Sequence, residues 1–121
     1  MKILVTGGFG YLGGRVAQSL VAQGYKVVLG SRREQSVPDW LSESEVVRID
    51  WDNQSSLKNV CKNINVVIHT AGMNAHDCAL DPVGAIEFNG VATAKLVQAT
   101  VAVGVKKFIY LSICSISREI K

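Results

Sequence analysis

Hydrophobic and polar residues follow two different patterns along this chain. Short runs of consecutive apolar residues, such as Ile3-Leu4-Val5, are typical of strands that are buried in a parallel sheet. Between these runs, apolar residues recur at helical spacing, as Leu12, Val16 and Leu20 do. The predicted strands are Lys2–Thr6, Lys26–Leu29, Val46–Ile49, Val66–His69 and Lys107–Ser112, and the predicted helices are Tyr11–Gln23, Gln54–Asn63 and Pro82–Val103.

The order of these elements predicts the fold class. Strands and helices alternate with short connections, so the strands are expected to be parallel and joined by right-handed crossovers. The result is an α/β protein with a Rossmann-type, doubly wound parallel sheet of about five strands in the order 3-2-1-4-5. All 121 residues are expected to form one Rossmann-type domain, because the chain is long enough for one hydrophobic core and too short for two.

Residues at the ends of the predicted helices support their placement. Gly24 and Gly104 follow the first and the last helix, where glycine commonly ends a helix. Asp52 or Asn53 can cap the middle helix, because a short polar side chain accepts a hydrogen bond from the first turn.

The last predicted helix is poor in charged residues. Between residues 83 and 103 only Glu87 and Lys95 are charged. A helix that covers one face of a sheet should be polar on its other side. We therefore expect this helix to bury two faces, one on the sheet and one on another helix. The alternative is a mildly apolar outer face made of alanine and valine.

Composition and charge exclude several classes of protein. The formal net charge is +3 and the basic residues are dispersed, which does not indicate nucleic-acid binding. No apolar run approaches the roughly 20 residues of a membrane span, and no secretory signal precedes the first strand. The three cysteines are odd in number and widely spaced, as expected of reduced thiols in the cytoplasm. No metal site is predicted, because the histidines have no clustered partners.

The most informative local feature follows the first predicted strand. Gly7, Gly10 and Gly13 separate this strand from the body of the helix that begins at Tyr11. Gly7 is expected to turn the chain sharply, Gly10 to let phosphate oxygens approach the backbone, and Gly13 to let helix and strand pack closely. The helix N-terminus then offers free N–H groups to an anion. This arrangement predicts a site for the pyrophosphate of a dinucleotide.

Residues 6–13 read TGGFGYLG, which resembles the TGGxGxxG fingerprint of the short-chain dehydrogenase/reductase superfamily. Asp50-Trp51-Asp52 is similar to the family element in which the first Asp accepts a hydrogen bond from the adenine amino group. The alternative, a cluster that caps the following helix, is compatible with this role if Asp52 is the cap. His69-Thr70-Ala71-Gly72 resembles the segment that lines the cofactor, with His69 interpreted as a packed strand residue. Lys107–Ser112 resembles the strand that ends at the catalytic hydroxyl. Among the members of this superfamily, the chain resembles the extended, NAD(P)-dependent epimerases, dehydratases and reductases of nucleotide-sugars.

The resemblance implies which residues contact the cofactor. They belong to the glycine loop, to the ends of the second and third strands, and to the segment after the fourth. The set is Gly7, Phe9, Gly10, Tyr11, Leu12, Gly13, Ser31, Arg32, Asp50, Trp51, Thr70, Ala71 and Gly72.

The end of the second strand bears on the choice of cofactor. An NAD-preferring site places an acid there to bind the ribose 2′-hydroxyl. This chain has Gly30 at that position, followed by Ser31 and Arg32. Arg32 can donate two parallel hydrogen bonds to a 2′-phosphate, and Ser31 can donate one, so NADP is the predicted cofactor. NAD stays possible, because NAD enzymes of the family also tolerate a missing acid. The other alternative for Arg32 and its neighbour is two solvated arginines in a loop.

The resemblance breaks at the catalytic residues. The family uses a Tyr-x-x-x-Lys pair for proton transfer, and no tyrosine of this chain has a lysine four residues later. Ile113 stands where the catalytic hydroxyl is usual. We therefore assign no catalytic residue and expect the N-terminal half of such an enzyme, inactive by itself and truncated near Lys121. The alternatives are a non-catalytic module that senses the dinucleotide, and a remnant without function.

Two partners follow from the same resemblance. A nucleotide-sugar substrate is expected only in a complete chain. In extended members the fourth helix packs against its symmetry mate, so we expect a homodimer through Pro82–Val103, with Val91, Ala94 and Val101 as candidates. The open edge of the last strand favours association too, unless residues 112–121 cover it.

Overall fold

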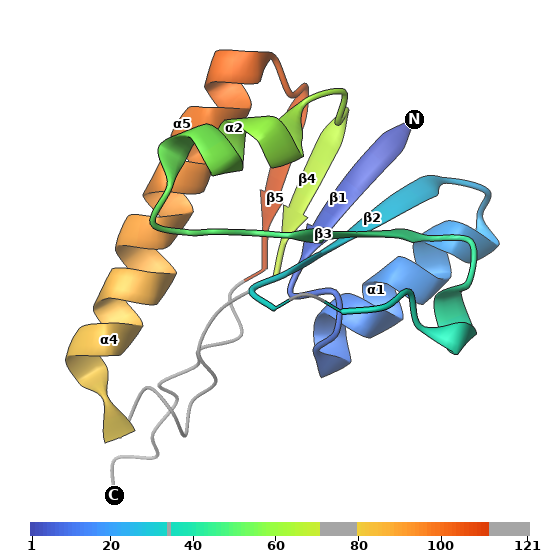
Figure 1. Cartoon of the computed structure of the whole chain (residues 1–121), viewed down its shortest axis with the longest axis horizontal. Helices are drawn as coiled ribbons and strands as arrows, with labels where there is room; N and C mark the ends of the chain where they lie inside the picture. Colours follow the sequence, from blue (N-terminus) through green and yellow to red (C-terminus); the bar gives the residue numbers. More distant parts are fainter. Residues whose placement is uncertain (34, 71–79, 112–121) are drawn as a thin grey trace, which may run out of the picture.

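The structure is a computed structural model and describes residues 1–33, 35–70 and 80–111. Its centre is a sheet of five parallel strands in the order β3-β2-β1-β4-β5, which confirms the predicted topology (Figure 1). The strands are β1 (Lys2–Thr6), β2 (Lys26–Ser31), β3 (Glu45–Arg48), β4 (Val66–His69) and β5 (Lys107–Tyr110). The helical elements are α1 (Tyr11–Ala22), η1 (Asp39–Leu41), α2 (Gln54–Cys61), α4 (Pro82–Ile86), η2 (Glu87–Ala92) and α5 (Thr93–Val103).

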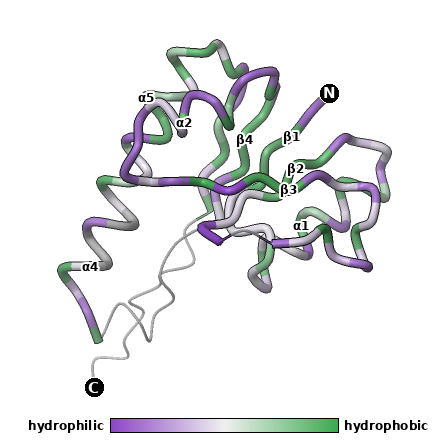
Figure 2. Tube along the Cα trace, viewed as in Figure 1, coloured by the Kyte–Doolittle hydropathy of each residue, from purple (hydrophilic) through white to green (hydrophobic). Residues whose placement is uncertain are grey.

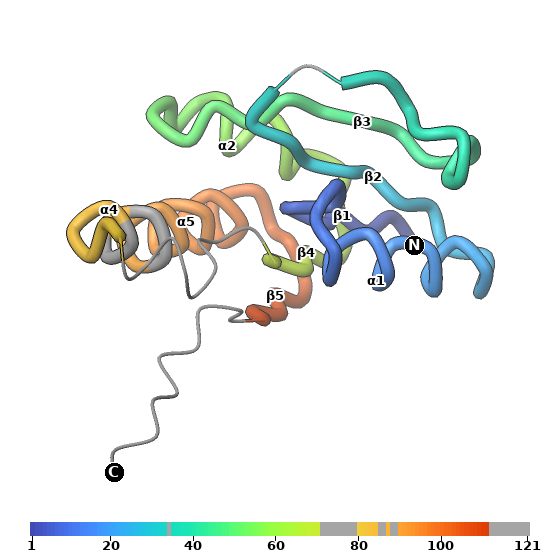
Figure 3. The backbone as a smooth tube through the Cα atoms, turned by 90° about the horizontal axis from the view of Figure 1, so that it is seen from below, coloured from blue at the N-terminus to red at the C-terminus, as the bar shows by residue number. Residues whose placement is uncertain are grey.

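The helices form two layers around the sheet. Helix α1 covers one face, and helices α2 and α5 cover the other (Figure 3). Each face has its own hydrophobic core. The α1 side is built on Ile3, Val5, Ala17, Val27, Leu29, Leu41 and Ile68. The other side is built on Leu4, Val28, Ile49, Trp51, Leu57, Cys61, Ile64, Val67, Ala92, Leu96 and Ala99.

The strands are the most apolar part of this arrangement. The trace through β4 is coloured mostly as hydrophobic (Figure 2). Three of its four residues are buried, as expected of a strand with helices on both sides of its sheet. No helix in the described ranges is long and apolar enough to cross a membrane.

Three strands have boundaries that differ from those predicted. Strand β2 continues to Ser31, because Ser31 pairs with Arg48 and its carbonyl accepts a hydrogen bond of 2.7 Å from the Ile49 N–H. This pairing also moves β3 one residue toward the N-terminus. Strand β5 ends at Tyr110, and the predicted end at Ser112 lies outside the described residues.

The helix caps follow local chemistry. Asn53 caps α2, since its side chain accepts a hydrogen bond of 3.1 Å from the Ser56 N–H. The alternative cap, Asp52, is wrong, because Asn53 occupies the N-cap position of α2. The backbone N–H of Asp52 donates to the side chain of Asp50. Gly104 ends α5 in the left-handed region, with φ of 81°.

The last predicted helix is interrupted. The π-helical turn η2 separates α4 from α5, so Pro82–Val103 is not one regular α-helix. Helix α5 packs on the sheet and on α2, which confirms the two predicted buried faces for this part. Gln54 of α2 adds a hydrogen bond of 3.2 Å from its side-chain amide to the Lys95 carbonyl.

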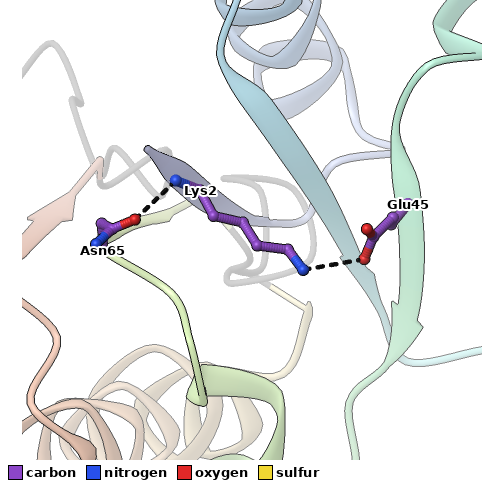
Figure 4. Close-up of polar contacts among 3 residues, drawn as sticks. All are labelled: Lys2, Glu45 and Asn65. Atoms are coloured by element: carbon purple, nitrogen blue, oxygen red, sulfur yellow. Dashed lines mark hydrogen bonds and ion pairs between the residues drawn. The ribbon is translucent and has the colours of Figure 1, made fainter.

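Polar contacts tie the amino ends of the strands together. The Lys2 N–H donates to the Asn65 side chain at 2.8 Å, and the Lys2 ammonium lies 3.3 Å from the Glu45 carboxylate (Figure 4). Lys2 thereby links β1 to β3 across β2 and to the turn before β4. The ion pair itself is exposed, so its contribution to stability is small.

Candidate functional site

The predicted site residues gather at the carboxyl edge of the sheet. Thr6 pairs with Gly30 on one side and with His69 on the other. The glycine loop, the end of β2 and Thr70 therefore begin at one level. The strand order reverses between β1 and β4, and ligands of open α/β sheets bind beside such a reversal. Figure 1 shows the chain leaving β1 at this edge and entering α1.

The glycine loop is a tight turn. Gly7 adopts φ of 67°, which an L-residue with a side chain rarely takes. The Gly10 N–H donates to the Gly7 carbonyl at 2.9 Å, and the Gly14 N–H donates to the Gly10 carbonyl at 2.8 Å. The loop thus joins the end of β1 to the first turn of α1 without an intervening segment.

The other glycines of the loop differ in what surrounds them. A Cβ on Gly13 would collide with the Gly7 carbonyl oxygen and lie 2.6 Å from the Thr70 hydroxyl, so helix and strand approach as closely as predicted. A Cβ on Gly10 would have only the Gly7 carbonyl oxygen nearby, at 3.2 Å, and Gly10 is exposed. The space outside Gly10 is therefore open to a ligand.

The packing role of Gly8 in this loop was not predicted from the sequence. A Cβ on Gly8 would lie 2.6 Å from Leu29 Cδ2, so this glycine is required by the neighbouring strand. No local sequence pattern indicates the packing role of Gly8, because its contact with Leu29 depends on how β2 lies beside β1.

The first turn of α1 suits an anion. Gly10 is the N-cap and offers no side chain to its N–H groups, and the first turn has no acidic residue. The positive end of the helix is therefore directed at the loop. Tyr11 begins the helix with 80% of its surface exposed, and the Arg15 guanidinium lies 4.7 Å from its ring centre. A dinucleotide pyrophosphate fits this combination of backbone donors and positive charge.

Three predicted residues turn their side chains away from open solvent. Phe9 packs against the core on the α1 side, and Leu12 is half-buried. Trp51 is 9% exposed and belongs to the opposite core, with its ring 5.6 Å from that of His69. The indole therefore packs in the core rather than facing open solvent.

At the end of β2, the residue that faces the glycine loop differs from the one predicted. A Cβ on Gly30 would lie 2.5 Å from Ile49 Cδ1, so position 30 faces the core beneath α2 and α5. An acid at this position would point away from the glycine loop. Side chains alternate along a strand, so Ser31 shares the face of Leu29, which packs under Gly8. Ser31, not Gly30, is therefore the residue at the end of β2 that lies on the side of the glycine loop.

Ser31 and Asp50 both organise local backbone. The Ser31 hydroxyl accepts hydrogen bonds from the Arg33 N–H at 3.2 Å and from the Gln35 side-chain amide at 2.9 Å. Asp50 accepts from the Asp52 N–H at 3.1 Å and is partly exposed. Arg32 is exposed beside Ser31. Ala71 and Gly72 lie outside the described residues.

His69 lies beneath the site. It is fully buried and bonded through both ring nitrogens, with Nδ1 2.7 Å from Thr6 Oγ1 and Nε2 2.8 Å from Thr93 Oγ1. Burial lowers the pKa of His69 from 6.5 to about 4, so the imidazole is neutral at physiological pH. The prediction of a packed strand histidine is confirmed. Its two threonine partners were not predicted, because they come from distant segments.

Comparisons with known proteins agree with this geometry. A model of the NAD dependent epimerase/dehydratase family matches residues 3–117. A UDP-glucose 4-epimerase of Klebsiella pneumoniae is 35% identical over 123 residues, which cover 93% of this chain and 88% of the relative. A UDP-glucose 4-epimerase of Rhizobium meliloti is 26% identical, over 94% of this chain and 36% of the relative.

Solved structures share the fold. The UDP-glucose 4-epimerase of Bifidobacterium longum, crystallised with NAD+ and UDP, superimposes with a TM-score of 0.80 at 24% identity. The match covers 93% of this chain and 37% of that protein. This chain thus spans little more than a third of the Rhizobium and Bifidobacterium proteins and most of the Klebsiella one.

Proposed function

Because the chain belongs to the NAD dependent epimerase/dehydratase family, we propose that it binds a nicotinamide dinucleotide at the carboxyl edge of its sheet. The observation that carries the proposal is the turn from Gly7 to Gly13. It directs an uncapped helix N-terminus at open space beside Gly10. In this proposal the backbone of residues 10–13 holds the pyrophosphate, and Asp50 accepts a hydrogen bond from the adenine amino group.

We propose further that NADP binds more tightly than NAD. Ser31 at the end of β2 carries no charge that would repel a 2′-phosphate, and Arg32 follows it on the surface. A guanidinium can donate two parallel hydrogen bonds to a phosphate. The solved relative described above contains NAD+, so the order of the two affinities is the informative measurement.

The proposed chemistry is that of nucleotide-sugar enzymes, with this chain supplying the cofactor site. The relatives named above are UDP-glucose 4-epimerases. Because no Tyr-x-x-x-Lys pair occurs in the sequence, the chain alone is proposed to be inactive. The same absence favours a second candidate, a non-catalytic module that binds the dinucleotide without turning it over. We place the protein in the cytoplasm, where its dinucleotide ligand is abundant.

Calorimetry with NADP+ and NAD+ tests the binding proposal. Gly10→Val places a branched side chain where the pyrophosphate would approach, and should weaken binding by tenfold or more, the equivalent of about 1.4 kcal/mol. Gly90→Val is the matched control, because a Cβ at Gly90 meets nothing within 4 Å. Equal affinities of the Gly10→Val and unmodified chains would contradict the proposal.

A turnover assay tests the proposed inactivity of the isolated chain. The chain is incubated with UDP-glucose and either dinucleotide, and UDP-galactose is sought by chromatography. No product is expected from the isolated chain. Product formed by a homogeneous preparation would overturn the claim of inactivity and favour the enzyme over the binding module.

A further inference from the structure

Hydrogen bonds connect α5 to Thr6 and Thr70 at the carboxyl edge of the sheet. Thr93, the first residue of α5, meets His69 Nε2 at 2.8 Å, and His69 Nδ1 meets the Thr6 hydroxyl at 2.7 Å. The Thr6 hydroxyl also accepts from the Thr70 N–H at 3.1 Å. The Thr70 hydroxyl donates to the Thr6 carbonyl and lies directly below Gly13. The connection therefore ends under the first turn of the proposed dinucleotide site.

Three of the four residues in this connection are buried, and Thr93 is half-buried. Thr6 and His69 are 0% exposed, and Thr70 is 4% exposed. A buried polar group that loses its partner retains its full desolvation cost. A neutral imidazole donates from one nitrogen and accepts at the other, so His69 orients the hydroxyls on both sides of it. Rings of Trp51, Phe108 and Tyr110, at 5.2 to 6.0 Å, hold the imidazole in place.

The π-helical turn explains how Thr93 reaches His69. A π turn adds a residue to the helix and rotates everything after it by about 100° relative to a continuous α-helix. Thr93 follows η2 directly and lies on the same side of α5 as the buried Leu96 and Thr100. Such turns occur frequently at functional sites.

We propose that His69 is a positioning residue that fixes the floor of the dinucleotide loop by joining Thr6 of β1 to Thr93 of α5. The inference deepens the proposed function and rests on it for the identity of the ligand. Thr6 is the residue from which the Gly7 turn departs, and its carbonyl is held by Thr70. Loss of the Thr93 bond on the far side of the sheet should therefore loosen the loop.

A pair of variants on one helix tests this role. Thr93→Val removes the hydroxyl that meets His69, and Thr93→Ser retains it. Thr100→Val is the matched control, because Thr100 is also buried on α5 but its hydroxyl donates to the Val97 carbonyl of its own helix. Amide hydrogen exchange in the ligand-free protein reports on the Thr70 N–H, and calorimetry reports the affinity for NADP+.

In Thr93→Val we expect the Thr70 amide to exchange about tenfold faster, the equivalent of one buried hydrogen bond. NADP+ affinity should fall several-fold, and Thr93→Ser should restore both values. Thr100→Val should lose stability without either change. If Thr93→Val does not fold, His69→Phe keeps the ring packing, removes both bonds and should give the same two effects.

Two outcomes overturn the inference. One is the same Thr70 exchange rate in Thr93→Val and Thr100→Val. The other is an unchanged affinity in Thr93→Val when the unmodified chain binds NADP+. Faster exchange in a chain that binds neither dinucleotide would instead refute the proposed function and leave the positioning role standing.

Discussion

Gly30 lies against Ile49, so closely that a Cβ on Gly30 would be 2.5 Å from Ile49 Cδ1. The contact shows which side of β2 faces the glycine loop. Position 30 is directed into the core shared with α2 and α5, and Ser31 lies on the opposite face with Leu29. If the dinucleotide binds as proposed, position 31 rather than position 30 sets the charge near its ribose.

Exchange of Ser31 for Asp should reverse the preference between the two dinucleotides. A carboxylate at position 31 can accept from the ribose 2′-hydroxyl and repels a 2′-phosphate. We expect the ratio of NADP to NAD affinity to fall by tenfold or more, about 1.4 kcal/mol. Arg32→Ala should lower the same ratio by removing a charge-assisted donor. Calorimetry with both dinucleotides measures each ratio.

Gly30→Asp provides the control for this prediction. Its carboxylate would be buried against Ile49, so the variant should lose about 3 kcal/mol of stability or more and leave the preference unchanged. If the ratio of NADP to NAD affinity changed in Gly30→Asp but not in Ser31→Asp, the side of β2 that faces the glycine loop would be assigned incorrectly.

Protonation of His69 should make stability depend on pH. The folded-state pKa of about 4 lies below the ordinary value of 6.5, so between these values the unfolded chain binds more protons. The full contribution of neutral His69 to the free energy of unfolding is therefore present above pH 6.5, and it decreases as the pH falls toward 4. At pH 5 the loss should be about 2 kcal/mol. Urea unfolding at pH 7.5 and at pH 5 gives the difference.

Variants of the two histidines show whether His69 causes the pH dependence of stability. His69→Asn should reduce the difference between the two pH values, although it lowers stability at both. His76→Asn, which removes the only other imidazole, should leave the difference intact. An equal pH dependence in all three chains would show that carboxylates rather than His69 cause it.

The parts of the structure that could be predicted depend on local pattern and chain connectivity. Strand order followed from alternating strands and helices with right-handed crossovers, and the Gly7 turn followed from a strand that runs directly into glycines. The face of the sheet toward which position 30 points could not be predicted, because it depends on Ile49, which follows the neighbouring strand β3. The register of Thr93 depends on one additional residue in a π turn, which leaves the apolar pattern almost unchanged.

Two glycines in open surroundings test how backbone conformation alone affects stability. A Cβ on Gly90 or on Gly104 meets nothing within 4 Å, but Gly104 has φ of 81°. Gly90→Ala should raise stability by about 0.5 kcal/mol or more, because alanine loses less entropy in a helix. Gly104→Ala should lower it by about 1 kcal/mol. Thermal unfolding of both variants measures the two signs, and a loss in Gly90→Ala would show that η2 requires glycine there.

A stripe along the outer surface of η2 and α5 is the predicted dimer contact. The predicted contact residues Val91, Ala94 and Val101 are all exposed. On α5 the exposed Gln98 lies between Ala94 and Val101, at spacings of four and three residues, which is the spacing of a helix–helix seam. Val91 is 50% exposed and Val101 75% exposed. Pairing this stripe with that of a second chain would remove both valines from water, at about 25 cal/mol for each Å² of apolar surface buried.

Replacing Val91 and Val101 by Lys should therefore shift the protein toward monomer. Two chains that meet along this stripe would bring four ammonium groups together, and like charges so placed oppose association. Light scattering after size-exclusion chromatography, over a range of concentrations, gives the dimer fraction of each chain. Tyr25→Lys with Val37→Lys adds the same charge at exposed positions beyond the stripe and should leave that fraction unchanged. An unmodified chain that stays monomeric at the highest concentration would refute the dimer, and an equal shift in both double variants would assign the effect to net charge.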